Sequence, residues 1–335
     1  MMSARDAQVH SPQPTAGTQP DSSADVGADH CFVVVGSERS GTTLFRLMLD
    51  HHPELSCMFE SNFMVDSYSR LKGKPAAAFA NAIREDWHFR HSGLQFPADA
   101  GSYRAAVDSF FCQRRQQSRK RIVGATFHRG FQHLPEMISD AKYIHLIRDG
   151  RPVAASIVNM GWAGNTYHGA RRWQDTIRRV LALQSRIDPD RWLMVRYEDL
   201  VTAPQAELNR VCRFLCVEYD EAMLQYPKRS TYDPPDADHA QRWKKRMSPR
   251  EILESEMAAR PELLAMGYEP LFPSCSPSVF ERLFLATGNR LGRFCFNTHR
   301  YGWYAHVIRK LRGWLRIPST EIERRHAAIR DAHVK

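Results

Sequence analysis

The chain has 335 residues, 43% of them hydrophobic, and a formal net charge of +10. This length suits one large α/β domain, and no segment approaches the roughly 18 consecutive apolar residues that cross a membrane. The first residues lack the apolar core of a secretory signal, and the seven cysteines are scattered without a Cys-x2-Cys pair. We therefore expect a cytoplasmic protein with neither a disulfide framework nor a zinc site.

The chain begins with a segment of low complexity. Residues 1–29 are rich in Ser, Pro, Gln, Asp, Ala and Gly and nearly lack large apolar side chains. Such a composition cannot bury enough apolar surface to form a core, so it predicts disorder. We expect the folded domain to occupy residues 30–270.

The stretch CFVVVGSERSGTT, residues 31–43, predicts a strand, a tight loop and the start of a helix. Phe32 to Val35 form a short apolar run that ends at Gly36, which is typical of a strand buried on both faces. Apolar residues recur at helical spacing from Leu44 onward. In this arrangement several backbone N–H groups and the positive end of a helix point at one small volume, which suits phosphate or sulfate.

The loop differs from the P-loop of nucleoside triphosphatases in the position of its cation. A P-loop has lysine directly after its second glycine, whereas Thr42 follows Gly41 here and Arg39 stands two places before that glycine. A kinase or NTPase is therefore disfavoured, also because no strand-end carboxylate clearly predicts a magnesium ligand. A plain strand-turn-helix corner, with glycines that serve only the turn, remains an alternative.

The segment GSERSGTTL resembles the 5′-phosphosulfate loop of sulfotransferases that use 3′-phosphoadenosine 5′-phosphosulfate (PAPS). The resemblance implies that backbone amides, Arg39 and the hydroxyls of Thr42 and Thr43 stabilise the sulfuryl and bridging oxygens. The loop residues that it assigns to the donor are Ser37, Glu38, Arg39, Ser40, Gly41, Thr42 and Thr43.

A carboxylate follows the predicted second strand, Leu55–Phe59. The segment LDHHPELSCMFES resembles the bacterial and tyrosylprotein branch of the family, in which His-Pro is followed by a catalytic glutamate. This resemblance implies that Glu60 removes the acceptor's proton; a solvated loop carboxylate is the alternative. Residues 62–120 predict a helical insertion near the acceptor, whose aromatic residues belong more often to a core than to a substrate site.

The third predicted strand, Arg121–Ala125, is followed by a departure from the family pattern. Many relatives carry a lysine there that stabilises the leaving phosphate, whereas Ala125, Thr126 and Phe127 occupy the corresponding positions here. His128 or Arg129 could supply the missing charge, and we count His128 among the candidate catalytic residues. A structural role for His128, or an altered acceptor chemistry, is the alternative.

The fourth predicted strand, Lys142–Ile147, leads into the segment RDGRPVAAS. This segment resembles the family's 3′-phosphate motif, which implies that Arg148 and Ser156 grip the 3′-phosphate. Arginine presents a planar fork to phosphate oxygens, and a serine one turn into a helix adds a hydroxyl donor. Asp149 favours the helix dipole and need not touch the ligand. We expect Pro152 at the first position of the helix.

Later elements complete the expected sheet and close the donor site. The pattern predicts a helix over 170–187, a buried strand over 192–197 and helices over 204–215 and 252–266. A basic-aromatic segment, Arg242, Trp243 and Lys244, is expected to close the donor pocket, with the indole on adenine and a cation at the 3′-phosphate. A solvated basic loop is the alternative.

The C-terminal extension, residues 271–335, is basic and rich in aromatic side chains. Residues 281–335 contain twelve Lys or Arg and four Asp or Glu, and so contribute +8 of the net charge. This mixture suits the surface of an acidic membrane or an acidic partner, and a packed helical appendage is an equal alternative. We expect no nucleic-acid partner.

The patterns together predict a P-loop-type α/β fold with three layers, α/β/α, around a parallel sheet, plus the helical insertion and extension. The resemblance, which spans residues 31 to about 268, implies transfer of a sulfuryl group from PAPS to a hydroxyl or amine without a metal. The acceptor stays open between protein tyrosine, carbohydrate, lipid and small phenol. Because the lysine is missing, a nucleotide-binding protein without activity is an alternative.

Overall fold

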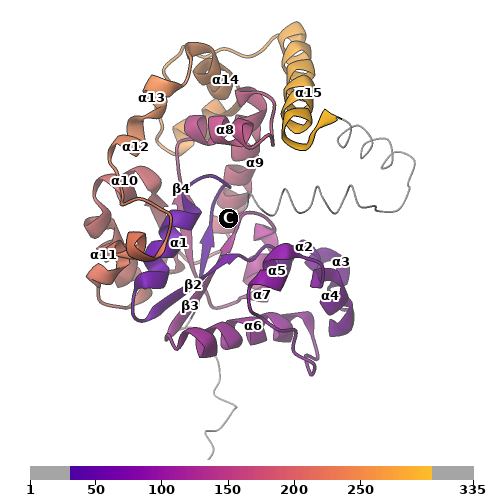
Figure 1. Cartoon of the computed structure of the whole chain (residues 1–335), viewed down its shortest axis with the longest axis vertical. Coiled ribbons are helices and arrows are strands. Elements are labelled where there is room, and N and C mark those ends of the chain that lie inside the picture. The colour runs from indigo at the N-terminus through magenta and orange to yellow at the C-terminus, as the bar shows by residue number, and fades with distance from the viewer. Residues whose placement is uncertain (1–30, 304–335) are drawn as a thin grey trace, which may run out of the picture.

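The computed structural model describes residues 31–303 (Figure 1). The disorder expected for residues 1–29 and the extension beyond residue 303 lie outside this part. Within it, five parallel strands form one sheet in the order β2-β3-β1-β4-β5. The strands are β1 Cys31–Val35, β2 Leu55–Glu60, β3 Ile122–Phe127, β4 Lys142–Ile147 and β5 Trp192–Arg196. The predicted central parallel sheet is therefore confirmed.

Helices cover both faces of the sheet and make up the insertion (Figure 1). In chain order they are α1 Thr42–His51, α2 Phe63–Asp66, α3 Tyr68–Leu71, α4 Ala76–Ile83, α5 Trp87–His91, α6 Tyr103–Ser118, α7 Leu134–Met137, α8 Gly150–Asn159, α9 Thr166–Gln184, α10 Tyr197–Thr202, α11 Pro204–Leu215, α12 Asp238–Gln241, α13 Trp243–Arg246, α14 Pro249–Ala265 and α15 Val279–Tyr301. Among the helices of residues 31–303, none is both long enough and apolar enough to cross a membrane.

Alternation along β1 divides the core into two layers. Phe32 and Val34 pack with α1, α10 and α11 on one face, whereas Val33 and Val35 pack with the insertion, α7 and α9 on the other. All four side chains are buried, as expected for a central strand with covered faces. The predicted three-layer α/β/α architecture is confirmed.

The strand order positions the functional edge of the sheet. β1 lies between β3 and β4, so the connections after it lead to opposite sides of the strand. Ligands bind at such a switch point, outside the carboxyl ends of the strands. Gly36, Glu60, His128 and Arg148 stand at the carboxyl ends of β1, β2, β3 and β4, and the fold therefore brings them to one edge.

The insertion forms an aromatic core of its own. The ring of Phe79 stacks on Tyr103 at a centroid distance of 3.7 Å, and Phe110 lies edge-on to Phe79 at 6.2 Å. All three side chains are buried. The expectation that most aromatic residues of this segment belong to a core is confirmed for these three.

Three local expectations were wrong. The strand at 192–197 is an edge strand with Met194 38% exposed, because β5 has a partner on one side only. Tyr197 begins α10 instead of ending this strand. Pro152 is the third residue of α8 and not the first, because the carboxylate of Asp149 caps the helix by accepting a hydrogen bond from the Arg151 amide.

Candidate active site

The loop from β1 to α1 needs glycine at both ends. A Cβ at Gly36 would lie 2.4 Å from the carbonyl oxygen of Leu146, and one at Gly41 would lie 2.4 Å from the ring of Tyr197. Gly41 also has φ +91°, and Arg39 has φ +68°, conformations that side chains rarely adopt. The loop is thus folded tightly against β4 and α10, with Arg39 held in a backbone conformation that residues other than glycine rarely adopt, which is typical of a binding loop.

The start of α1 is open to an anion. Its N-cap is Gly41, so no side chain caps the first amides, and no acidic residue stands in the first turn. The hydroxyl Oγ of Ser40 is buried and has no hydrogen-bond partner among residues 31–303. Uncapped amides and an unpaired hydroxyl around a positive helix end fit the phosphosulfate group of the expected donor.

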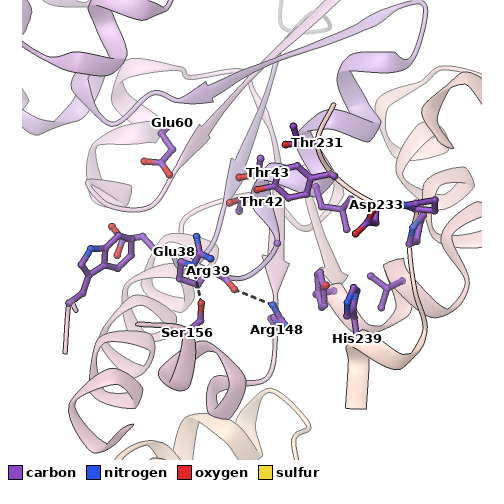
Figure 2. A pocket seen from close by; sticks show the side chains of 18 residues that line it. Glu38, Arg39, Thr42, Thr43, Glu60, Arg148, Ser156, Thr231, Asp233 and His239 are labelled. Carbon is purple, nitrogen blue, oxygen red and sulfur yellow. Dashed lines mark hydrogen bonds between the residues drawn. The ribbon is translucent and has the colours of Figure 1, made fainter. Parts of the chain in front are cut away.

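The two motifs meet across the loop although they are more than 100 residues apart. The Nε of Arg39 donates a hydrogen bond to Oγ of Ser156 at 3.0 Å, and Nη1 of Arg148 lies 3.5 Å from the carbonyl oxygen of Arg39 (Figure 2). The guanidinium of Arg148 also stacks on the ring of Tyr197, 4.1 Å from its centroid. The fold therefore brings together the glycine loop and the segment expected to bind the 3′-phosphate in one polar cluster.

A cavity of about 330 Å³ lies beside this cluster (Figure 2). Glu60 and Ser156 both line this cavity and lie apart from each other in Figure 2. The residues that line the cavity are Glu38, Arg39, Gly41, Thr42, Thr43, Leu44, Glu60, Arg148, Ser156, Trp162, Tyr197, Val201, Thr231, Tyr232, Asp233, Pro234, Pro235 and His239. Sequence reasoning did not single out Thr231–Pro235 or His239, because only the Pro-Pro pair marks this loop.

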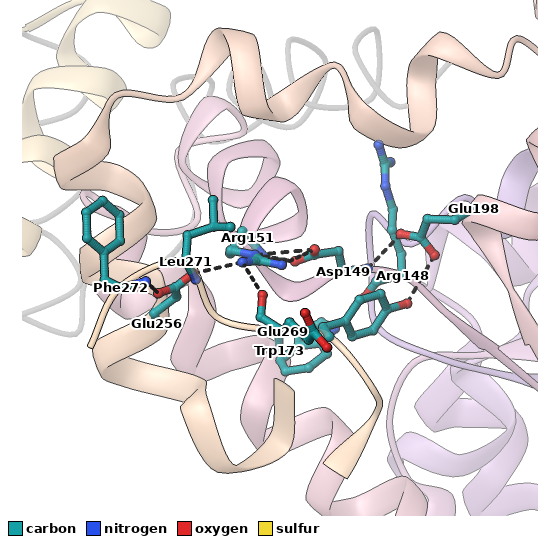
Figure 3. A network of polar contacts seen from close by, with 10 residues as sticks. Arg148, Asp149, Arg151, Trp173, Glu198, Glu256, Glu269, Leu271 and Phe272 are labelled. Carbon is teal, nitrogen blue, oxygen red and sulfur yellow. Dashed lines mark hydrogen bonds and ion pairs between the residues drawn. The ribbon is translucent and has the colours of Figure 1, made fainter. Parts of the chain in front are cut away.

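A buried ion network lies directly after Arg148, at the start of α8 (Figure 3). The carboxylate of Asp149 pairs with Arg151 at 2.7 Å, and Arg151 pairs with Glu256 of α14 at 2.8 Å. The amide of Asp149 donates to Oε1 of Glu198 at 3.0 Å. These contacts anchor the start of α8 to α14 and α10, and Asp149 therefore does not contact the cavity, as expected.

The basic-aromatic segment lies on a second cleft of about 450 Å³, which shares Arg148 and Ser156 with the first cavity and is also lined by Arg242 and Trp243. The guanidinium of Arg151 stacks on Trp243, 4.3 Å from the ring centroid, and only 6% of Trp243 is exposed. Arg242 pairs with Asp236 at 2.8 Å. The ammonium of Lys244 lies 5.8 Å from the indole ring.

Glu60 lies between two histidines at the end of β2. Its Oε2 is 3.3 Å from Nε2 of His88 on α5, and its Oε1 is 3.6 Å from Nε2 of His128. Burial alone would raise the pKa of Glu60, but the hydrogen bond from His88 holds it below the usual value. Arg129, the other candidate for the missing charge, pairs with Asp66 at 2.6 Å.

His88 was missed by sequence reasoning, because nothing local connects it to Glu60. It enters the site through α5, whose N-cap Asp86 accepts hydrogen bonds from two amides of that helix. A further cavity of about 290 Å³ opens beside Glu60. Its lining residues are Thr42, Thr43, Arg46, Phe59, Glu60, Trp87, His88, His91 and Thr126.

A tight glycine loop at the switch point of a parallel sheet, with two arginines and a carboxylate around one cavity, defines an α/β enzyme that handles an anionic group. The chain belongs to the sulfotransferase family, because the model described as "Sulfotransferase family" matches residues 32–221. It is thus an enzyme that transfers a sulfuryl group, and the resemblance inferred from the motifs is confirmed.

Individual relatives agree with this assignment. Protein-tyrosine sulfotransferase A of Caenorhabditis elegans is 25% identical over 262 residues, which cover 71% of this chain and 67% of the relative. Protein-tyrosine sulfotransferase 2 of Gallus gallus is 23% identical over 259 residues, 70% and 68% of the two chains. The solved sulfotransferase domain from the curacin biosynthetic pathway is similar in fold, with a TM-score of 0.52, 20% identity and coverage of 72% and 98%.

Proposed function

We propose that the protein transfers the sulfuryl group of PAPS to an acceptor hydroxyl or amine. The observation that carries this proposal is the contact of Arg39 with Ser156 beside Arg148, which joins the loop and the second motif on one wall of a cavity. A single nucleotide with one phosphate group on the 3′ position and another on the 5′ position of its ribose would contact both motifs at once. An ATP-binding protein would need only the first.

The donor would lie across the two clefts. Its phosphosulfate group would bind at the start of α1, where Ser40, Thr42 and Thr43 supply amides and hydroxyls. Its 3′-phosphate would lie at Arg148 and Ser156, which line both clefts. Arg242 and Trp243 adjoin that position, so a cation could reach the 3′-phosphate, but one neighbour of the indole is already the guanidinium of Arg151.

The reaction would be an in-line transfer between the two sides of the cavity. The acceptor's oxygen or nitrogen attacks sulfur while the bond from sulfur to the bridging oxygen breaks. Negative charge then grows on the bridging oxygen, where Arg39 and the amides of the loop stabilise it. Glu60 lines the same cavity as the loop residues (Figure 2), and it removes the acceptor's proton as general base.

The acceptor would enter through the cavity beside Glu60, whose wall includes Phe59 and Trp87, two rings that pack edge-on with their centroids 6.4 Å apart. The named relatives are protein-tyrosine sulfotransferases, so a tyrosine of a protein is the first acceptor to test. Incubating the enzyme with labelled PAPS and fractionated cell extract would show which fraction takes up the label. Label in a lipid or carbohydrate fraction would replace tyrosine as the acceptor.

Calorimetry with nucleotides tests the donor. The protein should bind adenosine 3′,5′-bisphosphate without added metal and should bind Mg-ATP much more weakly, since ATP has no 3′-phosphate for Arg148 and Ser156. A preference for Mg-ATP would overturn the donor assignment. It would favour the kinase alternative.

We further propose that α15 contacts the surface of an acidic membrane. One side of α15 packs on the loop before α9, where the amide of Gly164 donates to Asn289 at 2.7 Å. The opposite side exposes a stripe of large apolar residues: Val279, Phe280, Leu283, Phe284 and Leu291. Arg290 and Arg293 are also exposed on this helix, and residues 281–335 carry a net charge of +8. Apolar side chains beside cations suit acidic lipid.

A further inference from the structure

A continuous row of polar contacts runs from the insertion to the glycine loop through Glu60. At the outer end, Nδ1 of His88 lies 3.6 Å from Oδ1 of Asp86, and Nε2 of the same ring lies 3.3 Å from Oε2 of Glu60. At the inner end, Oε1 of Glu60 lies 3.6 Å from Nε2 of His128, whose Nδ1 is 3.0 Å from the carbonyl oxygen of Gly36. Each oxygen of the carboxylate therefore faces a different imidazole.

We propose that Glu60, His88 and His128 act as one proton-accepting unit, in which His88 orients the carboxylate and His128 finally receives the acceptor's proton. This inference rests on the proposed sulfuryl transfer. It adds a residue of the insertion to the machinery. It also gives His128 a task different from that of the lysine found in many relatives.

The position of His88 explains why it would serve as a positioning residue. Its ring lies between two carboxylates, which favour the imidazolium form, in which both nitrogens donate. Although burial lowers the pKa of His88, the hydrogen bonds with Asp86 and Glu60 raise it to about 9. The titratable or charged groups around it are Asp86 and His91 on its own segment, Glu60 on β2, His128 and Arg129 after β3, and Arg46 on α1. The charged ring keeps Glu60 ionised and ready to accept.

The tautomer of His128 follows from its partner. A carbonyl oxygen can only accept, so Nδ1 must carry the hydrogen that points to Gly36. In the neutral ring Nε2 then presents its lone pair to Oε1 of Glu60. The side chain of His128 is 1% exposed, so its route for proton exchange leads through Glu60, whose side chain is 45% exposed.

The transfer step balances with these groups alone. The acceptor's O–H bond breaks as its oxygen bonds to sulfur, and the proton goes to Glu60. The carboxyl then passes a proton from Oε1 to Nε2 of His128, and Glu60 is again a carboxylate. The bond from sulfur to the bridging oxygen breaks, and its electron pair leaves with the 5′-phosphate. The new imidazolium of His128 is paired with Glu60, so no isolated charge is buried.

Histidine NMR tests the unit without knowledge of the acceptor. The full chain, with labelled imidazole rings and with adenosine 3′,5′-bisphosphate added, is titrated from about pH 5 to 10. Signals are assigned with His88→Gln, His128→Gln and His91→Gln. His88 should titrate near pH 9 and neutral His128 should be the Nδ1–H tautomer. In Glu60→Gln, the midpoint of His88 should fall by about one unit or more, because one of its two carboxylate partners is lost.

His91 is the matched control, since it lies on the same helix and stacks on Trp87 at 4.3 Å. Its ring signals should be the same in Glu60→Gln as in the unaltered chain. An unchanged midpoint of His88 in that variant, or an Nε2–H tautomer of His128, would overturn the proposal. Glu60 is partly exposed, so Glu60→Gln should fold, and binding of the bisphosphate reports on the donor site separately. If the protein binds no bisphosphate, the proposed donor is wrong. The titrations would still show whether Glu60, His88 and His128 act as one unit.

Discussion

Replacing Arg148 by alanine should show how much the 3′-phosphate contributes to binding of the donor. Arg148 lines both clefts. Its guanidinium lies 3.5 Å from the carbonyl oxygen of Arg39 and stacks on the ring of Tyr197. Neither contact is a buried ion pair, so Arg148→Ala should fold normally. What the substitution removes is a charged donor for the 3′-phosphate.

The size of the effect follows from the type of contact. A hydrogen bond to a charged group contributes about 1.5–3 kcal/mol, which corresponds to an increase of about 10- to 150-fold in the Kd of adenosine 3′,5′-bisphosphate. The Kd of 5′-AMP, which lacks the 3′-phosphate, should hardly change. Isothermal calorimetry with both nucleotides measures the difference.

Arg104→Ala is a suitable control, because Arg104 is an exposed arginine of α6 that pairs with Asp108 at 3.8 Å, outside both clefts. It should leave both affinities unchanged. If Arg148→Ala weakened the binding of both nucleotides equally, Arg148 would contact the adenosine or the 5′-phosphate, which both nucleotides contain. If it weakened neither, the 3′-phosphate would bind elsewhere, and the two motifs would not serve one ligand.

Three further substitutions test other parts of the argument. Glu60→Gln should keep nucleotide binding but lower turnover by about 10²–10⁴-fold; equal turnover would exclude Glu60 as the base. Glu256→Gln should lower the free energy of unfolding by about 3–5 kcal/mol in urea denaturation, because it removes one of the two buried carboxylates that pair with Arg151. A loss below about 1 kcal/mol would show that Asp149 alone is enough to compensate the buried charge of Arg151. Removal of residues 279–335 should abolish binding to acidic vesicles, and binding of the full chain should weaken as salt rises; equal flotation of both forms would refute the lipid contact.

The sheet could be predicted because its signals are local. Phe32 to Val35 form a short apolar run that ends at a glycine, and β4 shows the same kind of run before Arg148. Parallel strands that start apolar and end polar place these ends at one edge whatever lies between them. The edge strand β5 was misjudged for the same reason, because Trp192–Arg196 has an apolar sequence but a partner on one side only.

The surroundings of the site could not be predicted, because they depend on contacts distant in sequence. Trp243 was expected to stack on adenine, but in the structure the guanidinium of Arg151, held by Asp149 and Glu256, already stacks on its ring. Arg151 and Glu256 are 105 residues apart. No local spacing in either segment reveals such a pairing.

His128 stands close to where many relatives carry a lysine, and the two side chains differ in one respect that bears on mechanism. A lysine is charged throughout the neutral pH range, so its effect on a leaving group does not depend on the acceptor. Under the proposal above, His128, whose Nε2 faces Glu60, would gain its charge from the proton that the acceptor loses. In the proposed unit, positive charge therefore appears beside Gly36 only as the acceptor attacks. In this proposal the insertion, through His88, positions the carboxylate that accepts the proton.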